Sequence, residues 1–490
     1  MLFNSWHFVA FFPVVCGLYF ICPYHKRWLL LLIASYYFYM CAIPGYALVL
    51  LASTGVDYFL GIKIADSEQQ AAKRRWLWAS VAMNLGVLFG FKYFNFFSES
   101  CQPLTSWLGV SLDLPRSDWL LPVGLSFYTF QTLSYSIDIY RGIQTPERHF
   151  GRYALFVSFF PQLVAGPIER STQLLPQFRQ NFDFDYNRVT SGLKLMAWGL
   201  FKKVVIADHL AVFVNCVYSD PEAYTGAHYA LATALFAIQI YCDFSGYSDI
   251  AIGAARVLGF RLMTNFDRPY ASRSVAEFWS RWHISLSTWF RDYLYIPLGG
   301  NRVAVPRWYL NLMIVFVISG LWHGASWTFV IWGLLHGTYL VVGYASQSGR
   351  KKLAHLIGLD QFPRLQAVLQ NASVFILVCF AWIFFRANSL ADAVTIVSGL
   401  TTGWTTVLHA GWLRELREMT GLSAGYFNTA LILIVVLELV QARPQREIGD
   451  WFHMFWTRST ALRWAGYVGL LLAIINLGAS KAQPFIYFQF

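Results

Sequence analysis

The sequence predicts an all-α polytopic membrane protein, and three observations support this fold class. The chain has 490 residues, of which 57% are hydrophobic and only 13% are charged, whereas soluble globular domains carry about 25% charged residues. Apolar runs long enough to enter or cross a bilayer recur along the chain. Short basic loops separate these runs, as in membrane proteins of defined orientation. We expect one integral membrane domain over residues 1–490.

The elements follow from the apolar runs. The first run has no basic segment before it and no convincing cleavage site, so we expect a membrane helix and not a removable signal peptide. The region 243–300 is too polar to span and too apolar for a plain loop, which favours short re-entrant or interfacial helices there. The expected membrane segments lie near 7–22, 28–43, 45–62, 77–97, 124–140, 153–166, 190–217, 227–242, 306–321, 325–344, 370–385, 427–441 and 464–479.

The distribution of charge predicts the orientation. The basic groups His25–Arg27, Lys73–Arg75 and Arg350–Lys352 fall on one side of the alternating segments, which the positive-inside rule assigns to the cytoplasm. The linker Ser98–Pro122 is mainly acidic and is expected outside. The net charge of +11 therefore belongs to loops that meet anionic lipid, and a nucleic-acid partner is not expected.

Two histidine segments near the centre are the strongest functional signal. They are Arg281-Trp282-His283-Ile284-Ser285 and Leu321-Trp322-His323-Gly324-Ala325. Histidine is costly in lipid and titrates near neutral pH, so the pair indicates chemistry within a membrane. Small residues on both sides of His323 allow a helix to end or another chain to approach closely. The alternative is a core histidine bonded to a neighbouring carbonyl group.

A polar stretch around the first histidine supports a binding site. Between Asn265 and Arg302 the chain interleaves arginines, carboxylates and aromatic rings, although it is otherwise poor in charge. Such a network near a bilayer is usually kept for a polar substrate, and an interfacial helix with aromatic anchors is the alternative. The candidate substrate-binding residues of the two histidine regions are Arg281, Trp282, Arg291, Asn301 and Trp322.

Further polar candidates lie inside apolar runs. Asp243, Ser245 and Asp249 directly follow the run 227–242 and could orient a histidine, line a channel or cap a helix that follows Asp249. Gln131 lies within the run 124–140 and completes the candidate substrate-binding residues. No zinc, Walker or dinucleotide motif is present, and no metal site is expected.

These strings resemble one known family, the membrane-bound O-acyltransferases, and in particular its bacterial alginate O-acetyltransferase branch. The resemblance extends over nearly the whole chain. It rests on both histidine segments and on the runs 122–131, 165–168, 243–249 and 484–490. The resemblance implies a ring of helices around a thin centre in the bacterial inner membrane, with a cytoplasmic tunnel and an outward funnel meeting at the catalytic histidine.

The resemblance also implies the roles of residues and partners. His323 is the expected catalytic residue and His283 supports it nearby. The expected donor is acetyl-CoA, or an acetylated carrier, on the cytoplasmic side, with no tightly bound cofactor. A neutral His323 would accept the proton of an acceptor hydroxyl group, expected to be a serine of a periplasmic SGNH-type acetyltransferase. Ser245 and Ser285 are the candidate nucleophiles if an acyl-enzyme forms, but direct transfer is favoured.

The sequence does not identify the polymer that finally receives the acetyl group. Alginate is the first expectation for the exopolysaccharide, and cellulose or peptidoglycan would require only a different partner. The alternative from a different functional class is a transporter that conveys an acyl group without catalysis. It predicts that a His323→Ala variant still transports, whereas an enzyme would lose acetylation.

Overall fold

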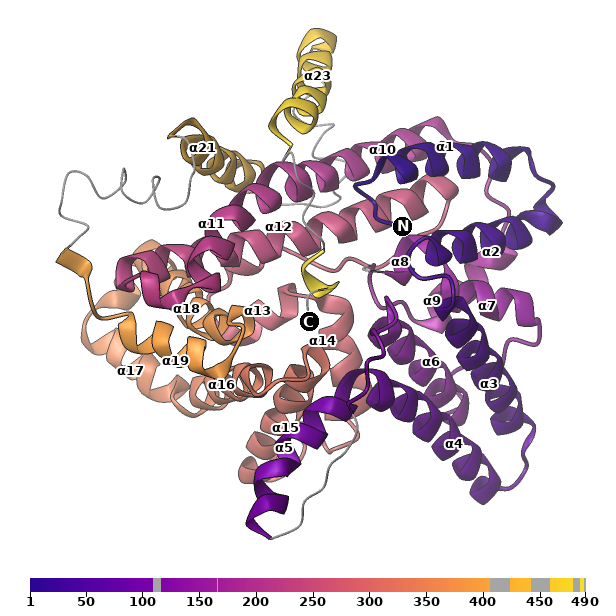
Figure 1. The fold of residues 1–490 in the computed structure, drawn as a ribbon, viewed down its shortest axis with the longest axis horizontal. Coiled ribbons are helices and arrows are strands. Elements are labelled where there is room, and N and C mark those ends of the chain that lie inside the picture. Colours follow the sequence, from indigo (N-terminus) through magenta and orange to yellow (C-terminus); the bar gives the residue numbers. More distant parts are fainter. Residues whose placement is uncertain (109–115, 165, 406–423, 442–458, 479–484, 489–490) are drawn as a thin grey trace. The chain divides into compact units, whose positions relative to one another are not determined.

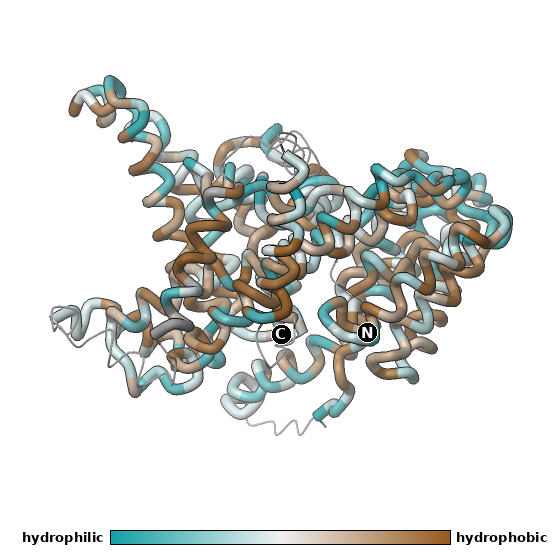
Figure 2. The backbone as a smooth tube through the Cα atoms, turned by 90° about the horizontal axis from the view of Figure 1, so that it is seen from above, coloured by the Kyte–Doolittle hydropathy of each residue, from teal (hydrophilic) through white to brown (hydrophobic). Residues whose placement is uncertain are grey.

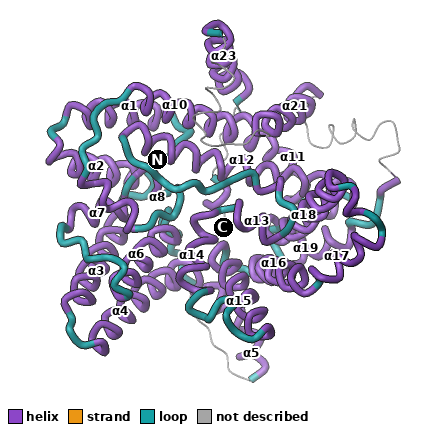
Figure 3. The backbone as a smooth tube through the Cα atoms, turned by 180° about the vertical axis from the view of Figure 1, so that it is seen from behind, coloured by secondary structure: helices purple, strands orange, loops and turns teal. Residues whose placement is uncertain are grey.

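The computed structural model describes residues 1–108, 116–164, 166–405, 424–441, 459–478 and 485–488. Every regular element in these ranges is a helix (Figures 1 and 3), which confirms the predicted all-α class. Of the motifs singled out in the sequence, Ala165, Pro484 and the last two residues lie outside the described ranges. Five described helices are long and apolar enough to cross a membrane: α3 (Tyr46–Asp66), the continuous helix Gln70–Trp107, α15 (Val305–His323), α16 (Trp327–Ala345) and α18 (Pro363–Arg386).

The chain divides into two compact units. Unit 1 comprises Met1–Met196 and Tyr247–Thr264, and unit 2 comprises Ala197–Gly246 and Asn265–Phe490. Figure 2 shows hydrophobic stretches of backbone alternating with hydrophilic ones. The expectations of a single domain and of a ring with a tunnel and a funnel stay predictions.

Unit 1 contains the N-terminal helices. After a π-helical turn at Phe89–Tyr93, the helix that begins at Gln70 continues to Trp107, so it extends ten residues into the segment expected to be a loop from Ser98. The remaining helices of this unit are α1 (Trp6–Ile21), α2 (Tyr24–Met40), α6 (Leu125–Tyr140), α7 (Phe150–Ser158), α8 (Phe160–Leu163), α9 (Ser171–Leu174) and α10 (Tyr186–Leu200, whose last turn belongs to unit 2).

Buried polar side chains connect α3, α4 (Gln70–Leu88) and α6. The Asn84 amide donates to both carboxylate oxygens of Asp57 at 2.9 Å, and Ser80 donates to the same carboxylate at 2.8 Å. Thr132 of α6 donates to Asn84 at 2.8 Å. Hydrogen bonds across helices are one of the main sources of packing energy in a membrane. This cluster therefore fixes three helices of unit 1 to one another.

Unit 2 contains the histidine segments. A π-helical stretch, η3 (Phe201–Ala207), continues α10 into α11 (Asp208–Ser219), and α12 (Gly226–Leu258) is shared by the two units. The sequence predicts short helices over 243–300, and the structure has them over 275–295, as α13 (Val275–Arg281), α14 (Ile284–Phe290) and η6 (Arg291–Tyr295). Residues 243–258 instead belong to the long α12. The remaining helices are α17 (Gln347–Leu356), α19 (Leu390–Gly399), α21 (Ala424–Gln441), α23 (Thr460–Leu477) and the terminal turn η9 (Ile486–Phe488).

One expectation about the acidic cluster is wrong. The helix α12 does not end near residue 242 but continues to Leu258. Asp243, Ser245 and Asp249 therefore lie in the middle of a helix, and the cluster does not cap a helix that begins after Asp249. No proline lies between Gly226 and Leu258 to end the helix earlier.

The helices α15 and α16 form a close antiparallel hairpin (Figure 1). A Cβ atom added at Gly320 would lie 2.2 Å from the Phe329 carbonyl oxygen, and one at Gly333 would lie 2.3 Å from that of Phe316. Only glycine permits this approach of the two backbones. The small residues before His323 therefore bring α16 directly against the helix that carries it.

Candidate active site

His323 is the last residue of α15 and lies at the α15–α16 turn. Gly324 follows it, and Ser326 begins α16 by accepting a hydrogen bond from the Thr328 amide. The His323 side chain is buried, with 3% of its surface exposed. Aromatic rings surround it at centroid distances of 4.9 to 5.5 Å: Trp322, Trp332, Phe385 and Tyr487. The imidazole is thus held in a ring-walled, largely apolar site.

His283 lies between α13 and α14 in a strained backbone conformation. Its φ is 43°, and among the described residues only Arg268 shares a positive φ without being glycine. The strain is compensated by Asn265, whose side-chain oxygen lies 3.1 Å from His283 Nδ1 and accepts from the Ser285 hydroxyl at 2.8 Å. The Asn265 carbonyl also accepts from the Ile284 amide at 2.9 Å. Non-glycine residues with such strain often lie at functional sites.

The two histidines share neighbours in unit 2. The Trp322 ring lies 4.9 Å from His323 and 6.1 Å from His283, and the Tyr487 ring lies 5.5 Å and 6.5 Å from them. Phe244 of α12 closes this group at 4.6 Å from both His283 and Tyr487. The structure therefore brings the two histidine segments together, as the sequence predicts, and adds the C-terminal turn to them.

Asp243 and Ser245 point to lysines of η3. Asp243 Oδ1 forms an ion pair with Lys203 at 2.7 Å, and Oδ2 accepts from the Ile486 amide at 2.8 Å. Lys203 also pairs with Asp208 at 2.8 Å, and all three side chains of this triad are buried. Lys202 donates to the Ser245 hydroxyl at 2.8 Å. Asp243 thus connects η3 to the C-terminal turn that touches the histidines.

The other predicted residues lie in different surroundings. Trp282 is buried and stacks on Phe278, with centroids 5.5 Å apart, whereas Arg281 forms a half-buried ion pair with Glu277 at 2.8 Å. Asn301 is exposed in the loop before α15. Gln131 and Asp249 are buried and belong to unit 1. Their roles in substrate binding stay predictions.

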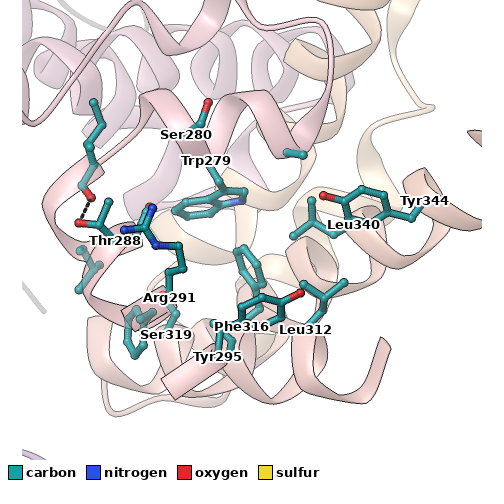
Figure 4. Close-up of a pocket in the computed structure, with 16 residues that line it drawn as sticks. Trp279, Ser280, Thr288, Arg291, Tyr295, Leu312, Phe316, Ser319, Leu340 and Tyr344 are labelled. Carbon is teal, nitrogen blue, oxygen red and sulfur yellow. Dashed lines mark hydrogen bonds between the residues drawn. The ribbon is translucent and has the colours of Figure 1, made fainter. Parts of the chain in front are cut away.

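A cavity of about 350 Å³ lies beside this group in unit 2 (Figure 4). Apolar side chains form most of its lining, including Trp279 of α13, Phe316 of α15 and Leu340 of α16. Ser319, one helical turn before His323, reaches it from α15. Arg291 supplies a cation at its edge; its side chain is 60% exposed and also pairs with Asp292 at 2.7 Å. The cavity is large enough to take the slender arm of a small ligand.

Aromatic side chains separate this cavity from His323. Trp279 contacts the ring of Trp332 at 5.7 Å and donates its indole N–H to Nδ1 of His336 at 3.2 Å. Trp332 in turn lies 5.0 Å from His323. Trp279 and Trp332 therefore both lie between the cavity and the histidine site.

Sequence reasoning missed several of these residues. The adjacent lysines 202 and 203 inside an apolar run were a usable signal, because buried lysines need partners. Tyr487 is part of the terminal run on which the resemblance rests, but nothing in the sequence places it beside His323. Asn265 and Trp279 have no signal beyond lying in the polar stretch 265–302, and Trp332 has none.

Comparison with known proteins identifies the family of the chain. A family model described as "MBOAT, membrane-bound O-acyltransferase family" matches residues 145–353, which include both histidines. "Probable alginate O-acetylase AlgI" of Pseudomonas putida is 36% identical over the full length of both chains. "Peptidoglycan O-acetyltransferase" of Helicobacter pylori is 37% identical over 82% of this chain and 80% of that protein.

A more distant relative is similar over about half of the chain. "Teichoic acid D-alanyltransferase" of Streptococcus thermophilus is 29% identical over 46% of this chain and 57% of that protein. The relatives differ in the polymer that they are named for, but each is named for acyl transfer. Because the full-length similarity and the family model agree, the chain belongs to the membrane-bound O-acyltransferase family and is an acyltransferase.

Proposed function

We propose that this acyltransferase moves acetyl groups from a cytoplasmic thioester donor across the inner membrane, for O-acetylation of an exopolysaccharide. The observation that carries the proposal is the buried His323, walled by aromatic rings and separated by Trp279 and Trp332 from an apolar cavity. A base held next to a slot for a slender donor is what acyl transfer to a hydroxyl group requires.

The donor is acetyl-CoA or an acetylated carrier that enters through the cavity. Tyr344, near the C-terminal end of α16, and Arg291 lie at the cavity, and the basic segment Arg350–Lys352 follows in α17. The positive-inside rule assigns that segment to the cytoplasm. An apolar slot with a cation at its edge suits an acyl thioester whose far end carries phosphate groups.

His323 acts as the general base in this proposal. A neutral imidazole accepts the proton of the acceptor hydroxyl as its oxygen attacks the thioester carbon, a contribution of about 10²–10⁴ in rate. Direct transfer is favoured over an acyl-enzyme, because the two candidate nucleophiles are engaged. Ser245 accepts from Lys202, and Ser285 donates its proton to Asn265.

The acceptor is a serine on a periplasmic SGNH-type acetyltransferase, which completes transfer to the polymer. The relatives are similar to this chain in sequence but are named for different polymers, which are alginate, peptidoglycan and teichoic acid, so a separate partner is the simplest way to select the polymer. Full-length similarity to the alginate protein favours alginate. Peptidoglycan is the second candidate, because the Helicobacter pylori relative is as similar in identity although over less of the chain.

The test uses the purified full-length protein in lipid nanodiscs, with radiolabelled acetyl-CoA and purified periplasmic acetyltransferases of the alginate and peptidoglycan types. We expect label on the alginate-type partner with wild type, and loss of label by at least about 100-fold with His323→Ala. Thermal unfolding of both proteins provides the folding control. Equal labelling by His323→Ala would refute the catalytic role of His323 and favour a transporter, and label only on the peptidoglycan-type partner would replace alginate by peptidoglycan.

A further inference from the structure

Two buried side chains with N–H groups, Trp332 and His336, lie on α16, and the first of them contacts His323. Trp332 and His336 are four residues apart on α16 and so share one face of it. Both side chains are fully buried, and their ring centroids lie 5.0 Å apart. Trp332 also lies 5.0 Å from the His323 ring, with an interplanar angle of 82°. The pair therefore extends from the catalytic imidazole towards Trp279, which lines the cavity.

The hydrogen bond from Trp279 fixes the proton on His336. An indole nitrogen can only donate, so Nδ1 of His336, which receives the Trp279 N–H at 3.2 Å, must be the unprotonated nitrogen. A neutral His336 then carries its proton on Nε2. Both Nε2 of His336 and Nε1 of Trp332 are hydrogen-bond donors.

Neither donor has a partner within the described ranges of the chain. A buried donor without an acceptor costs folding free energy, and two such donors on one helix face, beside the catalytic base, double that cost. Elsewhere in the same aromatic region the N–H of Trp382 does have a partner, because it donates to the Tyr270 hydroxyl at 3.2 Å. The acceptor for Trp332 and His336 is therefore expected to arrive with the substrate.

We propose that Trp332 and His336 form an oxyanion hole for the thioester carbonyl. The proposal rests on the proposed function, since it assumes that His323 is the base. As the acceptor oxygen bonds to the carbonyl carbon, its proton passes to His323 and the C=O electron pair moves to oxygen. The two N–H groups stabilise this oxyanion. The C=O bond then reforms, the C–S bond breaks, and the leaving thiolate takes the proton from His323.

The first test replaces Trp332 by phenylalanine and compares Trp382→Phe as the matched control. Both substitutions keep an aromatic ring in the same region; Trp382 stacks on Trp332 with centroids 5.8 Å apart. We expect Trp332→Phe to lower kcat by about 100-fold, because donors to an oxyanion act in the transition state. The KM for acetyl-CoA and the pH at half-maximal rate should stay at their wild-type values. Trp382→Phe should keep most of the wild-type kcat.

A second pair of variants examines His336. The glutamine side chain of His336→Gln has an N–H group that can donate to the oxyanion and an oxygen that can accept from the Trp279 indole. The leucine side chain of His336→Leu has neither group. We expect the glutamine variant to keep much more of the wild-type kcat than the leucine variant, at similar thermal stability.

Two results would overturn the oxyanion hole without affecting the proposed function. One is a Trp332→Phe enzyme with wild-type kcat while His323→Ala is inactive. The other is an equal loss in Trp332→Phe and Trp382→Phe, which would show that packing of the rings is the cause. Retained transfer by His323→Ala would instead refute the proposed function, whatever Trp332→Phe does.

Discussion

At the scale of single residues, the site depends on polar groups whose partners come from distant positions. His283 keeps its left-handed backbone because the loop residue Asn265 accepts from both sides of the turn. Asn265 itself has no signal in the sequence beyond lying in a polar stretch. The identity of the two histidines was predictable, since ionisable residues in apolar sequence are rare, but their support was not.

Glu169 in unit 1 offers a test of pH dependence outside the membrane-spanning helices. Its carboxyl group is fully buried, and one oxygen accepts from the Met263 amide at 2.5 Å. Burial raises its pKa from 4.5 to about 7, although the Met263 bond and Arg170 oppose the shift. Between these values the folded protein holds a proton that the unfolded chain has released. The ionisation of Glu169 therefore lowers the free energy of unfolding as the pH rises from about 4.5 to 7, and it has no effect at lower pH.

The variant Glu169→Gln should remove this dependence. Glutamine resembles the protonated acid, so we expect it to match wild type near pH 4 and to exceed it near pH 8, by roughly 3 kcal/mol at most. Thermal unfolding of both proteins in one detergent between pH 4 and 8 measures the difference. Parallel curves for the two proteins would contradict the raised pKa.

At the scale of elements, apolar periodicity located most helices but not their ends. The runs near 306–321 and 325–344 became α15 and α16 within three residues. The run at 227–242 became the much longer α12, because polar residues that face neighbouring helices do not stop a helix inside a membrane protein. Burial of polar side chains depends on tertiary packing, so a hydropathy pattern cannot show where such a helix ends.

Gly320 provides a prediction about the α15–α16 hairpin. In Gly320→Ala the new methyl group would meet the Phe329 carbonyl oxygen at 2.2 Å, so the helices must separate. Overpacking of this kind costs about 1–3 kcal/mol. Because His323 is three residues further on, acyl transfer should fall together with the unfolding temperature.

Gly343→Ala in α16 is the matched control. A Cβ atom there meets nothing within 4 Å, so only the higher helix propensity of alanine remains, which stabilises by about 0.5–1 kcal/mol. The two variants should therefore shift the unfolding temperature in opposite directions. A loss of equal size in both would show that close approach of the helices is not the cause.

At the scale of the whole chain, unit 2 joins segments that are remote in sequence. The Asp243 carboxylate accepts a hydrogen bond from the amide of Ile486, 243 positions away, and forms an ion pair with Lys203 of η3. Sequence reasoning singled out Asp243 and the terminal run separately, but it could not pair them, because no local periodicity encodes a contact of that separation. The same limit explains why Tyr487 was absent from the predicted site.

Asp243→Asn tests whether this ion pair holds the C-terminal turn. The change removes one of the two carboxylates that pair with the buried Lys203 within the described ranges and keeps Asp208, and removal of one partner from a buried pair costs about 3–5 kcal/mol. Part of that cost is offset by Asp208. We expect a lower unfolding temperature, faster hydrogen exchange at the Ile486 amide and reduced acyl transfer, since Tyr487 contacts both histidines.

Asp66→Asn is the control for this charge change. It breaks the ion pair between Asp66 and Arg148, whose atoms are 2.6 Å apart and whose side chains are both about half exposed or more. Exposed ion pairs contribute only about 0–1 kcal/mol to stability. Its unfolding temperature and transfer rate should stay near wild type. If Asp243→Asn costs no more than Asp66→Asn and the Ile486 amide stays protected, the buried triad does not hold the C-terminal turn against the histidines. Slow exchange with lost activity would instead place Asp243 in the chemistry itself.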